Sequence, residues 1–364
     1  MLKRNKILTI FLAIQVLFVF WIKKHPNLIE SFYSEGLYPK IASFLRTIFS
    51  VFPFSVGDVL YMIFVLWVLR SLYRFFKNKA KNWQFIFFNL TAKISIFYFV
   101  FHLFWGFNYY RKTLNEQLEV VIPKYNVAEL NLMTEKLLIK LQEVHFAITN
   151  SDTLAVHPKF TKSELLQKSE NAYTNLQKNM PQFTYTSQTV KKSLFSLPLT
   201  YMGFSGYLNP FTNEAQVNYK IPKIFLPIVA THEIAHQIGY ASESEANFIG
   251  YLAAVQSEDV LFQYAAYLMA FRYCLSELYA SEKAVYFEIY NRIPKGILKN
   301  LNESQKFWIN YKNPLEPVFK KMYDLFLKTN NQHHGITSYS KMVGLMMAFD
   351  KSKKYKNLLT HKTD

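Results

Sequence analysis

The sequence predicts an α+β domain, mostly helical, that follows three transmembrane helices at the amino terminus. Three observations support this fold class. Apolar residues are concentrated in the first 110 positions of the 364-residue chain. From residue 246 onward they recur at helical spacing, whereas residues 186–219 are rich in β-branched and aromatic residues broken by glycine and proline. Short strands and turns are therefore expected only in this middle stretch.

Three apolar runs have the composition of membrane spans, at about residues 7–22, 56–76 and 85–107. The first run, in which only Thr9 and Gln15 are polar, is short for a span and would suit the core of a cleaved signal peptide. The bulky and basic residues 21–24 stand where a cleavage site needs small ones, so a signal anchor is favoured. Residues 1–110 are thus predicted to form a membrane anchor, and residues 111–364 a separate domain.

Basic residues predict the orientation of the spans. Lys3, Arg4 and Lys6 precede the first run, and five Lys and Arg residues crowd positions 70–81 between the second and third. Both groups belong in the cytoplasm under the positive-inside rule, which places the chain after the third run on the extracytoplasmic side. Residues 41–54 are interrupted by Arg46 and Pro53 and are interpreted as an interfacial helix, not as a fourth span.

The net charge of +17 does not indicate a nucleic-acid-binding protein. Thirteen of the 42 Lys and Arg residues lie before residue 111, against three acidic residues, which leaves +7 for the rest of the chain. No compact basic block with interleaved aromatic residues follows, so no nucleic-acid partner is expected. The single cysteine, Cys274, excludes an intramolecular disulfide and lies in an apolar helical pattern, as a core residue would.

Helical patterns occupy most of the chain beyond the spans. Leucines predict a helix over residues 126–148, and Thr161 with Glu164 forms a capping box for a second helix that reaches Met180. Later helices are expected at residues 246–280, 303–310, 317–328 and 338–347. The segment 214–219 is predicted to expose a strand edge that could bind an extended peptide through backbone groups.

His232 and His236 lie four residues apart in the sequence THEIAHQ. On a helix their imidazoles project from one face and can share one cation, with Glu233 beside them to act on a bound water. This is the HExxH pattern of zinc peptidases. Pro227 suits the first turn of such a helix and Gly239 would end it. A catalytic zinc needs three protein ligands and one open position, so the chain must supply a third ligand.

Two glutamates at the start of the next predicted helix are candidates for the third ligand. Glu243 shares its helix face with small residues as far as Ala253, which would let this helix approach the histidine helix closely. Glu245 lies about 200° away around the helix and shares its face with large residues such as Leu252. We therefore predict Glu243 as the third ligand, with Glu245 as the alternative. Asn247, one turn beyond Glu243, is predicted to hold a ligating imidazole through its distal nitrogen.

HEIAHQ followed by E-x-x-A-N resembles the gluzincin arrangement, in which a helix after HExxH contributes a glutamate with Asp or Asn four residues later. More of the chain resembles an uncharacterised bacterial membrane family, domain of unknown function 3810, through the segments PFSVGD, WGFNYYR, GYLNPFTNEAQVN, HEIAHQIGYASESEANF and GITSYS. This resemblance implies a zincin-like metallopeptidase anchored in the bacterial inner membrane, with one zinc ion and a peptide or protein substrate. The interval from His236 to Glu243 is shorter than in familiar gluzincins.

The expected reaction is metal-assisted amide hydrolysis. A zinc ion would lower the pKa of a bound water and polarise the scissile carbonyl, while Glu233 would take the water proton and pass it to the leaving amine. The tetrahedral oxyanion also needs a donor. Candidates for this donor are Tyr201, His333, His334 and Tyr339.

Two other functions are compatible with these motifs. One is an intramembrane protease, in which residues 224–241 cross the bilayer, although Pro227 and Gln237 make this segment a poor span. The other is a metal-stabilised scaffold that binds a partner and cuts nothing. Glu233 argues against the scaffold, because a structural zinc site has no use for a base and usually closes its fourth position with a protein ligand. Lys93 and His102, in the third apolar run, are interpreted as structural.

Overall fold

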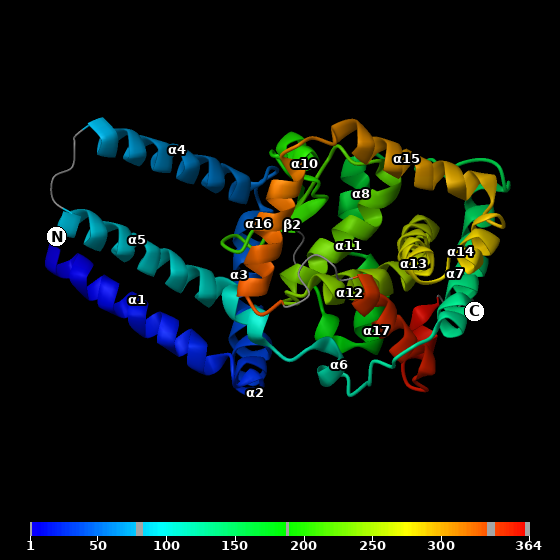
Figure 1. Ribbon diagram of the computed structural model, residues 1–364, viewed down its shortest axis with the longest axis horizontal. Helices are drawn as coiled ribbons and strands as arrows, with labels where there is room; N and C mark the ends of the chain where they lie inside the picture. Colours follow the sequence, from blue (N-terminus) through cyan, green and yellow to red (C-terminus); the bar gives the residue numbers. More distant parts are fainter. Residues whose placement is uncertain (1, 78–82, 187–188, 333–338, 361–364) are drawn as a thin grey trace.

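The structure is a computed structural model that describes residues 2–77, 83–186, 189–332 and 339–360, with only the backbone of Tyr339 (Figure 1). The described residues are mostly helical and contain one small sheet, which confirms that part of the predicted fold class. Figure 1 shows the long helices formed by residues 2–22, 56–77 and 83–104 extending to one side, with most of the remaining helices gathered on the other.

Three described helices are long and apolar enough to cross a membrane: α1 (Leu2–Ile22), α4 (Val56–Lys77) and α5 (Trp83–Phe104). They confirm the three predicted runs. The third ends at Phe104 because a short 3-10 helix, η2 (Gly106–Tyr110), follows it. Helices α1 and α5 lie side by side, and the amide of Gln15 donates to the Ser95 hydroxyl at 3.0 Å between them. Helix α4 lies apart from this pair in Figure 1.

The segment between α1 and α4 packs against the domain. It forms α2 (Pro26–Leu28), the π-helix η1 (Ile29–Leu37) and α3 (Tyr38–Ser50), the last of which corresponds to the predicted interfacial helix. The Arg46 side chain, expected to interrupt an apolar piece, is buried and donates to Asn213 Oδ1 at 2.8 Å and to the Gln237 carbonyl at 3.3 Å. The Tyr38 hydroxyl donates to the same carbonyl at 2.8 Å. Residues on both sides of the predicted boundary at residue 110 thus build one core.

The described sheet has three strands, β1 (Val190–Lys192), β2 (Gly206–Leu208) and β3 (Ala215–Val217), in the order β1-β3-β2. Strand β3 pairs in parallel with β1 and antiparallel with β2. The prediction of an exposed edge at residues 214–219 is therefore wrong, because β3 is central and buried. The edge of the described sheet on that side is β2. A helix, α10 (Ser196–Met202), also interrupts the stretch that was expected to hold only strands and turns.

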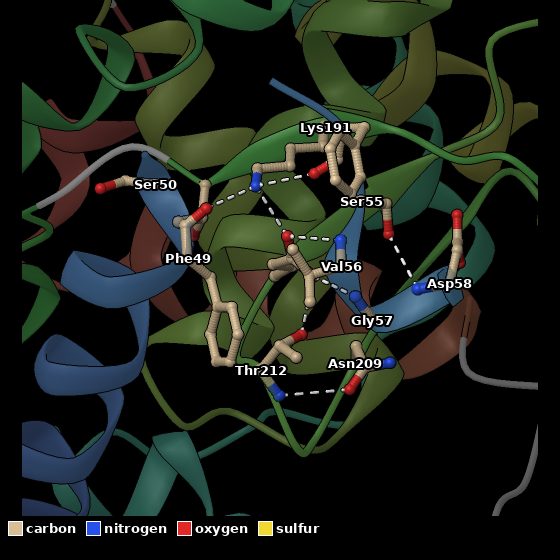
Figure 2. Close-up of polar contacts among 12 residues, drawn as sticks. Phe49, Ser50, Ser55, Val56, Gly57, Asp58, Lys191, Asn209 and Thr212 are labelled. Atoms are coloured by element: carbon tan, nitrogen blue, oxygen red, sulfur yellow. Dashed lines mark hydrogen bonds and ion pairs between the residues drawn. The ribbon is translucent and has the colours of Figure 1, made fainter. Parts of the chain in front are cut away.

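A buried ion pair joins this sheet to the start of α4 (Figure 2). The Lys191 ammonium donates to Glu214 Oε1 at 2.7 Å and to the Phe49 carbonyl at 2.6 Å. The same carboxylate accepts from the backbone N–H groups of Val56 at 3.1 Å and Gly57 at 2.6 Å. These amides open α4, and a helix amino terminus favours a negative charge. The motifs PFSVGD and NPFTNEAQVN are therefore parts of one polar network.

Of the remaining described helices, α8 (Lys162–Lys168) and α11 (Leu226–Gln237) pack against the sheet, and the capping box at Thr161 and Glu164 is confirmed. The helix that it opens ends at Lys168 and not at Met180. The helical stretches expected over residues 246–280 are confirmed as two helices, the second of which Asp259 caps through the Leu261 N–H. Cys274 is fully buried, as predicted. The helices are α6 (Leu114–Gln117), α7 (Val127–Thr149), α8 (Lys162–Lys168), α9 (Ala172–Asn179), η3 (Pro181–Phe183), η4 (Lys223–Phe225), α11 (Leu226–Gln237), α12 (Glu243–Val255), α13 (Val260–Ser281), α14 (Lys283–Tyr290), α15 (Lys295–Tyr311), α16 (Glu316–Thr329), α17 (Tyr339–Lys351) and η5 (Lys356–Leu359).

Candidate metal centre

The two histidines of the HExxH motif lie on one face of α11. Proline stands in the first turn of this helix, as predicted, and the helix packs between the sheet and α12. The Nε2 atoms of His232 and His236 are 3.1 Å apart. Together with a carboxylate oxygen of Glu233 they form a group whose ligand atoms lie within 4.8 Å of one another and could hold a metal ion.

The turn after α11 determines which ring nitrogen of His236 carries the proton. Gly239 has a φ of +102°, a left-handed conformation that suits glycine and lets the chain reverse at the end of the helix. The Tyr240 carbonyl then lies 2.7 Å from Nδ1 of His236. A carbonyl can only accept, so Nδ1 carries the proton and Nε2 presents its lone pair. Burial and the neighbouring His232 lower the pKa of His236 to about 4, which keeps the imidazole neutral.

Helix α12 approaches α11 closely enough to bring a carboxylate to these nitrogens. A Cβ atom on Gly250 would lie 2.8 Å from the backbone nitrogen of His232, so only glycine fits at this crossing. The Glu243 oxygens lie 3.5 Å from Nε2 of His232 and 3.7 Å from Nε2 of His236. A tetrahedral zinc with ligand bonds of about 2.05 Å separates its ligand atoms by roughly 3.3 Å. The short loop before α12 is therefore long enough to place Glu243 at ligand distance.

Electrostatics favour a charged Glu243 at this position. Burial opposes ionisation, but the hydrogen bond from His232 and the electrostatic effects of the two imidazoles lower the pKa of Glu243 to about 2. In turn, burial would lower the pKa of His232, yet Glu243 and Glu233 outweigh it and raise that pKa. The Tyr323 hydroxyl, on α16, donates to Glu243 Oε1 at 2.7 Å and fixes the carboxylate. No local sequence signal pointed to Tyr323, which is eighty positions away from its partner.

Glu245 points to a different part of the domain. Its Oε1 accepts from the Leu114 N–H at 2.8 Å, at the start of α6. Burial raises the pKa of Glu245 to about 7, although the Leu114 N–H and the Arg111 charge act in the opposite direction. The structure therefore brings Glu243, and not Glu245, to the two histidines.

Glu233 lies beside the three ligand candidates and is buried. Its Oε2 has no hydrogen-bond partner among the described residues, which is costly for a buried carboxylate. Burial and the Glu243 charge raise its pKa to about 8, against the effect of His232. On its other side the carboxylate packs on β2, where a Cβ atom on Gly206 would lie 2.6 Å from Glu233 Oε1. A carboxyl group with an unpaired oxygen and a pKa near neutrality can exchange a proton with a water molecule or a reacting group at this position.

Asn247 lies one turn beyond Glu243 and faces the same cavity. Its side chain is one of the groups that raise the pKa of His232. Nδ1 of His232 is buried and has no partner within hydrogen-bond geometry among the described residues, so the role of Asn247 stays a prediction. The supporting contact seen here is instead the Tyr240 carbonyl behind His236.

Of the predicted oxyanion donors, Tyr201 is the one whose side chain is described, and it is not among the residues that line the cavity at the site. Tyr201 lies on α10 with 47% of its surface exposed, and its ring packs edge-on against Tyr311. His333 and His334 lie outside the described residues, and of Tyr339 only the backbone is described. Among the described side chains, Tyr323 lines the cavity, and its hydroxyl donates to Glu243.

A cavity of about 1050 Å³ opens in front of these residues. Its wall includes His232, Glu233, His236 and Glu243, the whole of edge strand β2, and aromatic residues from α5 and α16. The indole of Trp105, directly after α5, packs edge-on against the His236 ring with centroids 6.3 Å apart. The site is thus a deep pocket between the sheet, α12, α16 and the end of a membrane helix.

The chain matches a known protein family. A family model described as "Protein of unknown function (DUF3810)" matches residues 33–347, which is most of the chain. No curated protein and no solved structure matches the chain. The match spans the histidine helix, the sheet and the last two membrane helices, so these parts occur together as one unit.

Proposed function

The chain belongs to the DUF3810 family, and because that family is described without an activity, we propose its function from the site alone: a membrane-anchored, zinc-dependent metallopeptidase. The observation that carries the proposal is the convergence of His232, His236 and Glu243 beside the unpaired Glu233 carboxylate. Two neutral imidazoles and one carboxylate are a known donor set for catalytic zinc. A catalytic zinc held by these three side chains would keep its fourth position for water or substrate.

Each residue has a distinct part in the proposed reaction. When bound by His232, His236 and Glu243, zinc would supply Lewis acidity toward a water and toward the scissile carbonyl. Glu233 takes a proton from the attacking water and returns it to the leaving amine, for which a pKa near the working pH is suitable. The carboxylate product gains the water oxygen, and the amine leaves with the transferred proton. Edge strand β2, beside Glu233, offers backbone groups to an extended peptide.

The structure gives less support to the two other functions. An intramembrane protease would need the HExxH helix to span the bilayer, but α11 has twelve residues and is not among the three described helices long enough to cross. A scaffold without catalytic activity has no role for Glu233, because a buried carboxylate oxygen without a hydrogen-bond partner destabilises the fold.

Zinc content tests the ligand assignment. In the full-length protein, Glu243→Ala should weaken zinc binding by more than about 100-fold, because loss of a residue that only supports a ligand already costs about 10- to 100-fold. Glu245→Ala is the matched control, since it removes a buried glutamate two positions away that contacts Leu114 instead. Metal analysis after dialysis against a zinc buffer measures both variants. If Glu245→Ala loses zinc and Glu243→Ala keeps it, the site must be reassigned.

We also propose that the domain faces the extracytoplasmic side of a bacterial inner membrane. The three membrane helices support membrane association, and the basic residues at the amino terminus and around residues 70–81 support this side. Alkaline phosphatase fused after Asp364 should be active and a fluorescent protein fused there should be dark. A fluorescent fusion with inactive phosphatase would reverse the assignment.

A further inference from the structure

The cavity in front of the metal centre continues into the membrane part of the protein. Its wall includes Tyr61 on α4 and Phe97, Tyr98 and Phe101 on α5, besides the residues of the metal centre. These four aromatic residues lie within helices that are long and apolar enough to cross the bilayer. One space therefore connects the candidate ligands with the surface of two membrane helices.

The metal centre lies close to the end of the membrane span. Trp105 follows the last residue of α5, and its ring centroid is 6.3 Å from that of His236. Tryptophan is typical of the boundary between hydrocarbon and headgroups. An extended peptide advances about 3.3 Å per residue, so roughly two residues separate a bond at the ligands from this boundary.

Helices α4 and α5 contact one another through few described side chains. Phe64 packs on Phe97 with ring centroids 6.2 Å apart, and Phe211 contacts both Tyr61 and Phe97 from the domain side. By contrast, α1 packs closely along α5. The weakly packed side between α4 and α5 is therefore the side from which a hydrocarbon segment would enter the cavity.

One side chain in this apolar wall, His102, has a hydrogen-bond acceptor without a partner among the described residues. His102 is buried, and its Nδ1 lies 2.9 Å from the Tyr98 carbonyl, so Nδ1 carries the proton. Its Nε2, a hydrogen-bond acceptor, has no partner among the described residues although the ring lines the cavity. His102, interpreted from the sequence as structural, thus has a free acceptor at the junction of the two parts of the cavity.

We propose that the substrates are membrane-anchored polypeptides whose hydrocarbon segment lies within a few residues of the cleaved bond and occupies the cavity between α4 and α5. This inference rests on the proposed peptidase function and specifies its substrate class. The hydrocarbon is either an acyl chain or the apolar end of a transmembrane helix. The peptide next to it crosses Trp105, runs along β2 and presents one amide to Glu233. Water adds across that amide, so that the C–N bond breaks, the acyl carbon gains OH and the amine gains a proton.

The test uses the full chain in nanodiscs of phosphatidylethanolamine and phosphatidylglycerol. One randomised octapeptide library is supplied in four forms: soluble, palmitoylated at its amino terminus, palmitoylated through a 30-residue Gly-Ser linker, and fused to an apolar helix of about 20 residues. The linker, with a reach of roughly 30 Å, keeps the library at the membrane but frees the hydrocarbon from the scissile bond. A diazirine in each hydrocarbon segment reports its position by photo-cross-linking, independently of cleavage.

We expect mass spectrometry to show that a directly attached anchor accelerates cleavage at least about tenfold over the long-linker form. Cross-links should fall on cavity residues of α4 and α5 and should persist in Glu233→Gln. Phe97→Ala should lower cross-linking by about tenfold. Phe87→Ala is the matched control, because Phe87 is an equally exposed phenylalanine of α5 outside the cavity. The palmitoyl and helix forms show which hydrocarbon source is preferred.

The remaining outcomes separate this inference from the peptidase function. Equal cleavage of the direct and long-linker forms overturns the inference and leaves the peptidase in place. Cavity cross-links without cleavage of any form support the anchored ligand and overturn the peptidase. Cross-links that are absent, or equal for Phe97→Ala and Phe87→Ala, show that the cavity does not select an anchored peptide. Cross-links from a diazirine phospholipid that the library cannot displace identify bilayer lipid as the occupant and also overturn the inference.

Discussion

Glu233→Gln should abolish peptide hydrolysis and leave zinc binding near one ion per chain. The substitution preserves the shape of the side chain, which is confined between the histidines and Gly206. An amide cannot take a proton from water, and loss of a general base typically lowers rates by about 10²- to 10⁴-fold. His232, His236 and Glu243 remain in place, so the metal site should persist. Cleavage of the peptide library and metal analysis on the same sample measure the two effects.

Glu245→Gln provides the control for this experiment, because it neutralises a buried glutamate of α12 that contacts Leu114 and does not reach the histidines. It should retain both activity and zinc. Unchanged hydrolysis in Glu233→Gln would remove the peptidase interpretation. Loss of zinc together with activity would make Glu233 a ligand, as its carboxylate oxygen is within 4.8 Å of both imidazoles.

Lys191→Met should lower the free energy of unfolding by about 3–5 kcal/mol, the usual cost of removing one partner of a buried ion pair. The methionine would leave the Glu214 carboxylate, which is fully buried, without its cation. The carbonyls of Phe49 and Phe54 would also lose the ammonium that they share, at 2.6 and 3.0 Å. Tryptophan fluorescence during denaturant unfolding in detergent micelles measures the change.

Lys192→Met is the matched control for this variant. Lys192 is the next residue of β1, but its side chain is exposed and only lies over the ring of Tyr219. Its loss should change the free energy of unfolding by no more than about 0.5 kcal/mol. The double variant Lys191→Met with Glu214→Gln should recover part of the loss, because no unpaired charge then stays buried. Equal effects of the two lysine substitutions would show that the ion pair does not hold α4 to the sheet.

Local patterns were sufficient for the parts of the site that lie close together in the chain. The four-residue spacing of His232 and His236 fixes their common face, and helical geometry separates Glu243 from Glu245. The structure shows both arrangements. The membrane helices could also be predicted from composition alone, because a run of about twenty apolar residues is compatible with few structures other than a membrane-spanning helix.

Contacts between distant segments could not be derived in this way. Tyr323 reaches Glu243 only because α16 crosses the mouth of the site, and nothing in its own periodicity specifies that crossing. The sheet edge was assigned to the wrong strand for a related reason: β3 has the composition of any short strand, and its central place depends on pairing with both β1 and β2. Arg46 interrupts an apolar run, yet its partners lie about 140 or more positions later.

The contacts that Glu214 makes with the start of α4 have a practical consequence for work on this protein. A soluble fragment that begins at residue 111 would lack the Val56 and Gly57 amides that Glu214 binds. It would also lack Tyr38, which donates to the last residue of the histidine helix. Such a truncation would remove contacts that hold the Glu214 carboxylate and the end of the histidine helix. The smallest unit that can be purified with an intact site therefore includes the membrane helices, and assays belong in detergent or in a bilayer.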